Sequence, residues 1–132
     1  MSHEIHWLAL TLGLTLSFWV PYVLNRMLVR GVWGTLANPR ADDVPLSPWA
    51  QRAKAAHANA IENLAVFAPA ALAIHVAGLG NSMTDLACGL YFFARLTHFL
   101  VYSAGIPVLR TLAFFAGWAG TALLVARLLG WS

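Results

Sequence analysis

Charged residues are scarce in this chain. Of its 132 residues, 10% are charged and 60% are hydrophobic, whereas a soluble domain carries about 25% charged residues. Packing in water cannot hide this much apolar surface, so the composition predicts one domain, residues 1–132, embedded in a membrane. The eight basic residues, of which Lys54 is the only lysine, are too few for a nucleic-acid surface. We therefore expect no nucleic-acid partner.

Cysteine is nearly absent as well. The single Cys88 excludes an internal disulfide and a dithiol redox pair. Because it lies in an apolar run, we interpret it as a small core or lipid-facing residue. The amino terminus has no Arg or Lys before its first apolar stretch and no small-residue cleavage site after it. We therefore interpret that stretch as a retained helix rather than a signal peptide.

Four stretches are long and apolar enough to cross a bilayer, which needs about 20 residues. They are Ile5–Val29, Trp49–Ala77, Met83–Ile106 and Arg110–Leu129. The sequence therefore predicts an all-α, integral membrane four-helix bundle with up-down-up-down topology. Pro21 and Pro69 fall inside these stretches, and membrane helices tolerate such prolines.

The longest polar connection, residues 30–48, contains Asn38-Pro39, Asp42-Asp43, Pro45 and Pro48, which suit an ordered loop better than a helix. Basic residues gather around this loop, namely Arg26, Arg30, Arg40, Arg52 and Lys54. Arg110 flanks the third connection, and only Arg127 lies near the opposite face. The positive-inside rule then predicts a cytoplasmic loop and both termini outside.

Polar residues interrupt the second and third stretches. Asn59, Glu62 and Asn63 share one helix face through their i, i+3, i+4 spacing. Arg95, His98 and Tyr102 form a stripe at i, i+3, i+7 on the third stretch. A charge at the bilayer centre costs about 2.5–3.5 kcal/mol on insertion scales. We therefore expect Glu62 and Arg95 to face protein or water and to find partners.

The depths of the two stripes can be compared. At a rise of 1.5 Å per residue from a turn near Gly80, Glu62 lies about 25 Å and Arg95 about 20 Å along antiparallel helices. The stripes are thus predicted to meet in the cytoplasmic half of the bilayer. Two interpretations stay open: a Glu62–Arg95 ion pair that only fixes helix packing, or a functional pocket that contains this pair.

Other chemistries find little support in the sequence. His57 and His98 lack the spacing of a metal or haem pair, so we expect no metal. No nucleophile elbow surrounds a serine, and the glycines form no phosphate-binding loop.

Several motifs occur in an order that resembles a known family. The run RAKAAHANAIENLAVFAP, residues 52–69, contains His57-x-Asn59-x-x-Glu62, and the third stretch contains Arg95-x-x-His98-x-x-x-Tyr102. The long loop contains Ala37-Asn38-Pro39, and the turn before the fourth stretch reads Gly105-x-Pro107-x-x-Arg110. Together they resemble the MAPEG family, the membrane-associated proteins of eicosanoid and glutathione metabolism, and in particular its bacterial branch and its synthase and glutathione-transferase members.

The resemblance implies a homotrimer, a bacterial inner-membrane location, and glutathione as a co-substrate bound between subunits near the cytoplasmic face. Small residues on the second stretch (Ala56, Ala60, Ala70 and Ala73) suit close helix contacts in such a trimer. Arg110 and Tyr102 are expected to be catalytic. The binding positions carried over are Arg30, Arg52, His57, Asn59, Glu62, Arg95, His98 and Tyr102. Arg52 is included because Ala55 stands where the family's synthases have an arginine.

The resemblance implies a glutathione-dependent transferase or peroxidase acting on a lipophilic electrophile, with lipids and a lipophilic small molecule as partners. Arg110 would place positive charge beside the thiol and favour the thiolate. Two alternatives stay open. One is a non-catalytic, lipid-binding protein of the same fold, which the change at Ala55 favours. The other is a small proton-coupled exporter with Glu62 as its membrane carboxylate.

Overall fold

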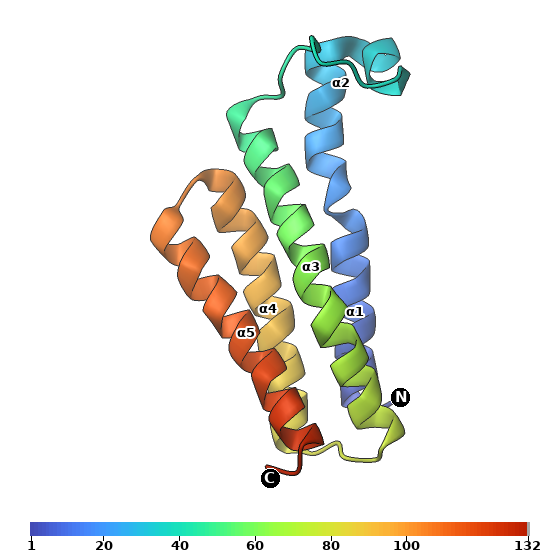
Figure 1. Ribbon diagram of the computed structural model, residues 1–132, viewed down its shortest axis with the longest axis vertical. Helices are drawn as coiled ribbons and strands as arrows, with labels where there is room; N and C mark the ends of the chain where they lie inside the picture. The colour runs from blue at the N-terminus through green and yellow to red at the C-terminus, as the bar shows by residue number, and fades with distance from the viewer. Residues whose placement is uncertain (132) are drawn as a thin grey trace.

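The chain folds into a bundle of long helices (Figure 1). A computed structural model describes residues 1–131. The helices are α1 (His3–Ser17), α2 (Trp19–Leu36), α3 (Pro48–Val76), α4 (Ser82–Ala104) and α5 (Pro107–Leu128). Because α1 and α2 continue in one line, the bundle has four rods, each long and apolar enough to cross a membrane. Residues 1–131 contain no strand, and the rods run up-down-up-down, so the predicted fold class is confirmed.

The first rod departs from its predicted bounds at two points. Pro21 has no N–H to donate to the Ser17 carbonyl, which explains why α1 ends at Ser17 and α2 begins at Trp19. Gly31 then adopts a left-handed φ of 72°, and the chain turns there. Residues 32–36 form a further helical turn, so the prediction of a loop from residue 30 was wrong for this segment.

The remaining helices begin and end within three residues of their predicted positions. Their ends have local causes. Asn81 and Thr84 form a reciprocal capping box at the start of α4. Gly105 ends α4 in a left-handed conformation with φ 80°, and Pro107 opens α5 two residues later. This tight turn places the first residues of α5 directly beside the last residues of α4.

Glycines on α5 let it approach α4 closely. A methyl group at Gly120 would lie 2.7 Å from the Ala87 carbonyl oxygen. On the other side of α4, the ring of Tyr91 stacks on Phe67 of α3 with centroids 3.7 Å apart. Tyr91, Phe67 and Ala87 are all almost fully buried. Small residues and stacked rings thus hold α3, α4 and α5 together.

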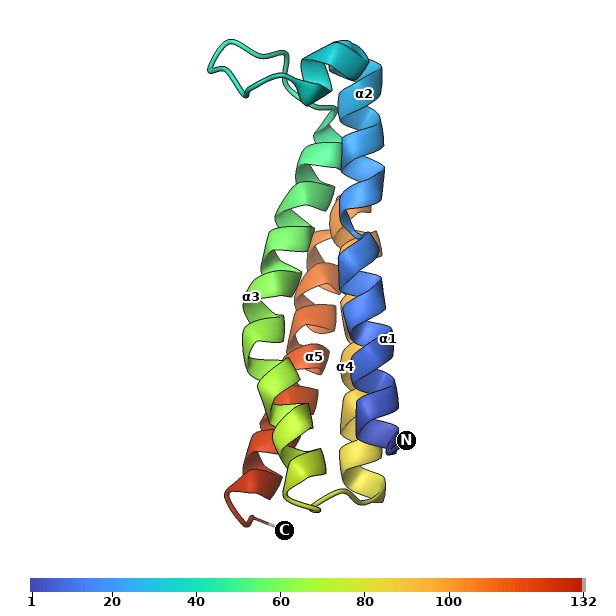
Figure 2. The ribbon, with the colours of Figure 1, turned by 90° about the vertical axis from the view of Figure 1, so that its right-hand side faces the viewer.

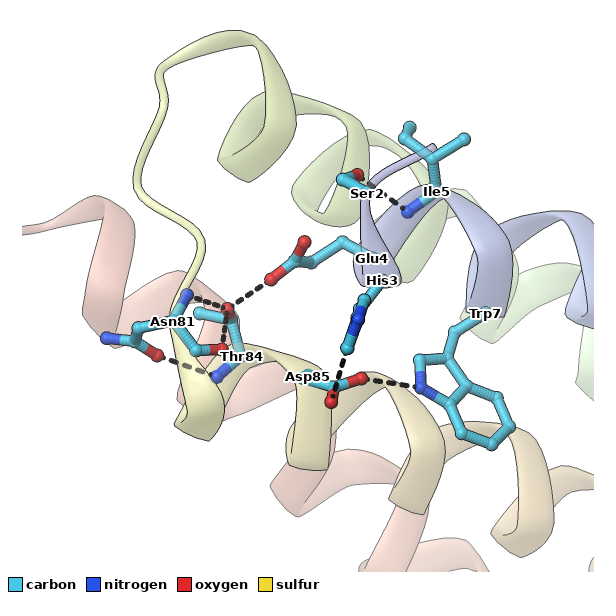
Figure 3. Close-up of polar contacts among 8 residues, drawn as sticks. All are labelled: Ser2, His3, Glu4, Ile5, Trp7, Asn81, Thr84 and Asp85. Carbon is cyan, nitrogen blue, oxygen red and sulfur yellow. Dashed lines mark hydrogen bonds and ion pairs between the residues drawn. The ribbon is translucent and has the colours of Figure 1, made fainter.

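Polar contacts fasten the amino terminus to α4 at the end of the bundle where both termini lie (Figures 1 and 3). The Thr84 hydroxyl donates to the buried Glu4 carboxylate. The Asp85 carboxylate accepts from His3 and from the Trp7 indole, each at 2.8 Å. These contacts fix the height of α1 against α4.

The rods differ in length, and this difference sets the level in the bilayer of the bundle end opposite the termini. With 29 residues α3 is about 43 Å long, whereas the 23 residues of α4 and 22 of α5 give about 33 to 35 Å. The hydrocarbon core of a bilayer is about 30 Å thick. The loop ends of α2 and α3 extend past the α4–α5 turn (Figure 1), so they reach the headgroup level when α4 and α5 span the core.

We predict that Gly120→Ala destabilises the protein by about 1–3 kcal/mol, because the new methyl group forces α5 away from the Ala87 carbonyl. Gly13→Ala is the matched control. Gly13 is an exposed helical glycine with no heavy atom within 4 Å of an added methyl group, so it should be neutral or slightly stabilising. Thermal unfolding in detergent measures both. Equal melting temperatures for the two variants would contradict this account of the α4–α5 contact.

Candidate functional site

A polar cavity of about 170 Å³ lies between α3, α4 and α5 on the side of the α4–α5 turn. Four of the residues that the sequence singled out line it together: Asn59, His98, Tyr102 and Arg110. Asn59 comes from α3, His98 and Tyr102 lie one turn apart on α4, and Arg110 lies in the first turn of α5. The two predicted stripes therefore do meet near this end of the bundle.

The Gly105–Pro107 turn brings Arg110 and Tyr102 into contact. The Arg110 guanidinium carbon lies 4.6 Å from the centre of the Tyr102 ring, within the range of a cation–π interaction. The Arg110 side chain is half-buried rather than extended into solvent. This contact fixes one permanent positive charge at the wall of the cavity.

Arg95 lies behind the cavity and organises it. It is 2% exposed, and its Nη2 donates to Asn59 Oδ1 at 2.7 Å and to His98 Nδ1 at 3.3 Å. Since a guanidinium can only donate, His98 Nδ1 must accept, which leaves the imidazole proton on Nε2. Arg95 therefore sets the tautomer of His98 as well as the orientation of the Asn59 amide.

The cavity wall is consequently rich in donors. The Asn59 oxygen is taken by Arg95 and, at 3.2 Å, by Asn63, which leaves the Asn59 amide nitrogen to donate. His98 Nε2, the Tyr102 hydroxyl and Arg110 add further donors. None of the cavity-lining side chains is acidic. Such a wall suits an anion.

The expected Glu62–Arg95 pair does not form within the chain. Glu62 is exposed on the outer face of α3, and within residues 1–131 it has no hydrogen-bond or ion-pair partner. Asn59, three residues earlier, takes the place that Glu62 was predicted to have. The prediction failed because helix spacing gives a shared face only roughly, and the 100° between successive residues puts Glu62 to one side of Arg95.

Three other predicted site residues lie elsewhere. Arg52 donates from Nε to the Ser103 carbonyl at 3.0 Å and so caps the end of α4. His57 faces the first rod, where its Nδ1 shares a 2.8 Å hydrogen bond with the Tyr22 hydroxyl. Arg30 donates from Nε to the Val44 carbonyl at 2.7 Å in the long loop. None of the three lines the cavity described above.

Two residues that line the cavity, Thr111 and Phe114, were not among the predicted site residues. Thr111 follows Arg110 directly and donates to the Pro107 carbonyl at 3.2 Å. Phe114 lies four residues after Arg110, so it shares the same helix face. The spacing i, i+4 from Arg110 was the available signal for Phe114. Thr111 gave none, because a threonine in the first turn of a helix is common.

An apolar groove of about 500 Å³ runs between α3 and α5 beside the cavity. Val66, Trp118 and Val125 are among its lining residues, and Asn63 marks its polar end. Asn63 donates to the Asn59 carbonyl at 2.8 Å, so the groove begins one turn from the donor-rich cavity. A polar site and an apolar channel are thus adjacent on one side of the molecule.

These features define an integral membrane four-helix bundle with a donor-rich cavity near one end. The chain belongs to the MAPEG family, whose family model matches residues 5–130. Neither the curated proteins nor the solved structures contain a significant match to the chain.

We predict that Asn59→Leu destabilises the protein by about 3 kcal/mol, because it leaves the buried Arg95 guanidinium without its closest acceptor. Asn63→Leu, the same change one turn along, should cost about 1 kcal/mol or less, since it removes only bonds between neutral groups.

Adding Arg95→Leu to Asn59→Leu should recover part of the loss, since no buried charge then lacks a partner. Chemical or thermal unfolding in detergent provides the double-mutant cycle. Strict additivity of the two substitutions would show that Asn59 and Arg95 do not depend on each other.

Proposed function

We propose that the protein is a membrane-embedded, glutathione-dependent transferase or peroxidase that acts on a lipophilic electrophile. The observation that carries this proposal is the donor-rich cavity, in which Asn59, His98 and Arg110 meet in a member of the MAPEG family. Glutathione is an anionic thiol peptide, and arginine and amide donors match its carboxylates. Members of the family generally use glutathione, which supports the same co-substrate here.

Four of the cavity residues have roles in this proposal. Asn59 and His98, held by Arg95, bind a carboxylate of glutathione. Arg110 lies beside the sulfur and stabilises the thiolate with its positive charge. Tyr102 donates its hydroxyl to the same sulfur and keeps Arg110 in place through the ring contact.

The reaction follows from the thiolate. With a halogenated aromatic substrate, the sulfur forms a bond to carbon and the halide leaves with the bonding electrons. With a lipid hydroperoxide, the sulfur attacks the terminal oxygen, the O–O bond breaks, and the alkoxide takes up a proton to become an alcohol. The attacking sulfur keeps the terminal oxygen and becomes the sulfenic acid of glutathione. This sulfenic acid then reacts with a second glutathione to give the disulfide and water.

The lipophilic substrate would use the groove between α3 and α5. Val66 and Trp118 supply apolar contacts for a hydrocarbon chain, and the Asn63 end of the groove adjoins the cavity through Asn59. A lipid-soluble electrophile could therefore enter from the bilayer and present its reactive atom to the thiolate.

A second subunit is needed to complete the site. The cavity of about 170 Å³ is smaller than the range of about 300–1,000 Å³ typical of ligand pockets. It also lacks an acidic group for the glutathione amine. Glu62 is exposed on the adjacent face of α3, and we propose that it serves the site formed with a neighbouring chain.

The outer face of α3 supports a homotrimer. Exposed residues recur along it at alternating steps of four and three: Gln51, Ala55, Ala58, Glu62, Ala65, Pro69, Leu72 and Val76. This is the period of helices that pack side by side, and its alanines permit close approach. Ala56, Ala60 and Ala70, which we had expected at such an interface, are instead buried within the chain, and Ala73 is half-buried.

The other residues carried over from the family act differently in this proposal. Arg52 and His57 are positioning residues, because Arg52 holds the end of α4 that bears Tyr102 and His57 holds the first rod against α3. Arg30 would reach glutathione only from a neighbouring chain, since its guanidinium fixes the loop of its own chain.

The non-catalytic, lipid-binding alternative also has an observation in its favour, because the α3–α5 groove is suited to a hydrocarbon chain with or without catalysis. The exporter alternative required Glu62 inside the bundle. Glu62 is exposed on the outer face instead, so no observation favours an exporter.

The proposal predicts that Arg110→Ala lowers turnover of glutathione with chlorodinitrobenzene by about 10²-fold or more, as expected for loss of a charge that stabilises the reacting anion. Glutathione binding should change little, because the carboxylate contacts remain. Tyr102→Phe should have a smaller effect, since the ring that holds Arg110 is kept. Turnover and calorimetric binding separate the two steps. Glutathione binding without turnover in the unaltered protein would favour the lipid-binding alternative.

The trimer is tested by native mass spectrometry in mild detergent, where three copies are expected. Ala65→Trp should reduce the trimer to smaller species, because the indole separates the α3 helices along the exposed stripe. Leu100→Trp, on the exposed face of α4, is the control and should leave the trimer intact. A monomer or dimer as the main species of the unaltered protein would exclude the trimer.

A further inference from the structure

A second polar cavity, of about 530 Å³, lies at the loop end of the bundle between α2, α3 and the loop of residues 37–47. Its lining includes four basic side chains, Arg26, Arg30, Arg40 and Lys54, and one acidic side chain, Asp43. The donor-rich cavity described above shares none of these residues. Any ligand that binds here faces a strongly positive wall.

The loop that forms one wall of this cavity is held in place. Asn25 exchanges two hydrogen bonds with Ser47, from Nδ2 to the hydroxyl at 2.9 Å and from the Ser47 N–H to Oδ1 at 3.0 Å. The Gln51 amide donates to the Leu46 carbonyl at 2.7 Å, and Leu46 is buried. These bonds fix the loop against α2 and α3, so the cavity has a defined shape.

Two of the four cations are already engaged by the loop. Arg30 donates to the Val44 carbonyl at 2.7 Å and lies 3.6 Å from the Asp43 carboxylate. Arg40 lies 3.4 Å from Asp42. Arg26 and Lys54, in contrast, have no hydrogen-bond or ion-pair partner within residues 1–131.

Three side-chain atoms of residues 1–131 are buried without a hydrogen-bond partner, namely Arg26 Nε, Arg95 Nε and the Tyr91 hydroxyl. Of these residues only Arg26 lines the cavity at the loop end. Buried polar groups in proteins are almost always hydrogen-bonded, and a buried charged donor without an acceptor is costly. Lys54 projects from the neighbouring helix α3 into the same cavity. Neither Arg26 nor the exposed Lys54 has a negatively charged partner within residues 1–131.

The position of the cavity limits what such a partner is. Its lining residues come from the later part of α2, the first turns of α3 and the loop between them. These ends of α2 and α3 extend beyond the α4–α5 turn (Figures 1 and 2), to the level of the lipid headgroups when α4 and α5 span the hydrocarbon core. Basic pockets at this depth bind phosphate-bearing lipid headgroups. We propose that Arg26 and Lys54 bind the phosphate of an anionic phospholipid, with Arg40 at the rim. None of the three proposed phosphate contacts is among the residues proposed to bind glutathione.

The test uses the purified full-length protein in a neutral detergent and three probes: phosphatidylglycerol, phosphatidylcholine and inorganic phosphate. Native mass spectrometry measures bound lipid, and thermal unfolding measures stabilisation. Phosphatidylglycerol should bind at least about fivefold more tightly than zwitterionic phosphatidylcholine. Arg26→Gln should lower the affinity for phosphatidylglycerol about five- to tenfold, and Lys54→Gln by a similar or smaller factor.

Arg127→Gln is the matched control, because it removes one positive charge at the opposite end of the bundle. It should leave phosphatidylglycerol affinity unchanged. Without lipid, Arg26→Gln should melt at or above the temperature of the unaltered protein, since it removes the unpaired Nε donor. Glutathione binding should also be unchanged in this variant.

The outcomes separate the sources of the phosphate. Binding of inorganic phosphate as tight as that of the lipid, and lost in Arg26→Gln, would keep the anion site but assign it to a soluble ligand. Equal phosphatidylglycerol affinity for the unaltered protein and a folded Arg26→Gln variant would overturn the proposal. Equal loss in Arg26→Gln and Arg127→Gln would also overturn it, because the effect would then reflect net charge alone.

Discussion

A guanidinium that lies inside a membrane protein needs acceptors, and side chains from two helices supply them for the Nη2 atom of Arg95, while its buried Nε has no partner within residues 1–131. Its Nη2 reaches Asn59 on α3 and His98 on α4, and the residue is almost completely buried. These two bonds fix the height of α3 against α4. They also turn the donors of Asn59 and His98 toward the cavity that Arg110 closes from α5. The geometry of the candidate site thus follows from the cost of a buried charge.

The two ends of the bundle serve different purposes. At the end with the termini, the Glu4 carboxylate accepts a hydrogen bond from Thr84, and the Asp85 carboxylate accepts from His3 and Trp7 (Figure 3). These polar groups hold α1 against α4. At the loop end, Arg26, Lys54 and Arg110 keep donors that the chain itself does not use up. Unused donors on rigid elements are available for ligands, and both proposed binding sites lie at this end.

The position of Ala55 gains a meaning from the fold. In the sequence it stood out because the family's synthases have an arginine there. The structure places Ala55 on the exposed stripe of α3, away from the cavity of its own chain. If α3 helices meet in a trimer, an alanine at this position permits closer packing there than an arginine would. The substitution would then alter the interface between subunits more than the donors around the thiol.

The sequence by itself determined the membrane class, the four spans and the family. Long apolar runs, turn residues such as Gly105 and Pro107, and motif order are local properties that do not depend on how the helices are rotated. It also identified Asn59, His98, Tyr102 and Arg110, which the fold does bring together. Only the tertiary structure decided which face of α3 each polar residue occupies. Residues three apart differ by about 60° around a helix, and that rotation separates the bonded Asn59 from the exposed Glu62. The tertiary structure also decided that Arg52 caps the end of α4 and that the Nε of Arg26 has no partner. Both outcomes depend on distances between segments that lie far apart in the chain.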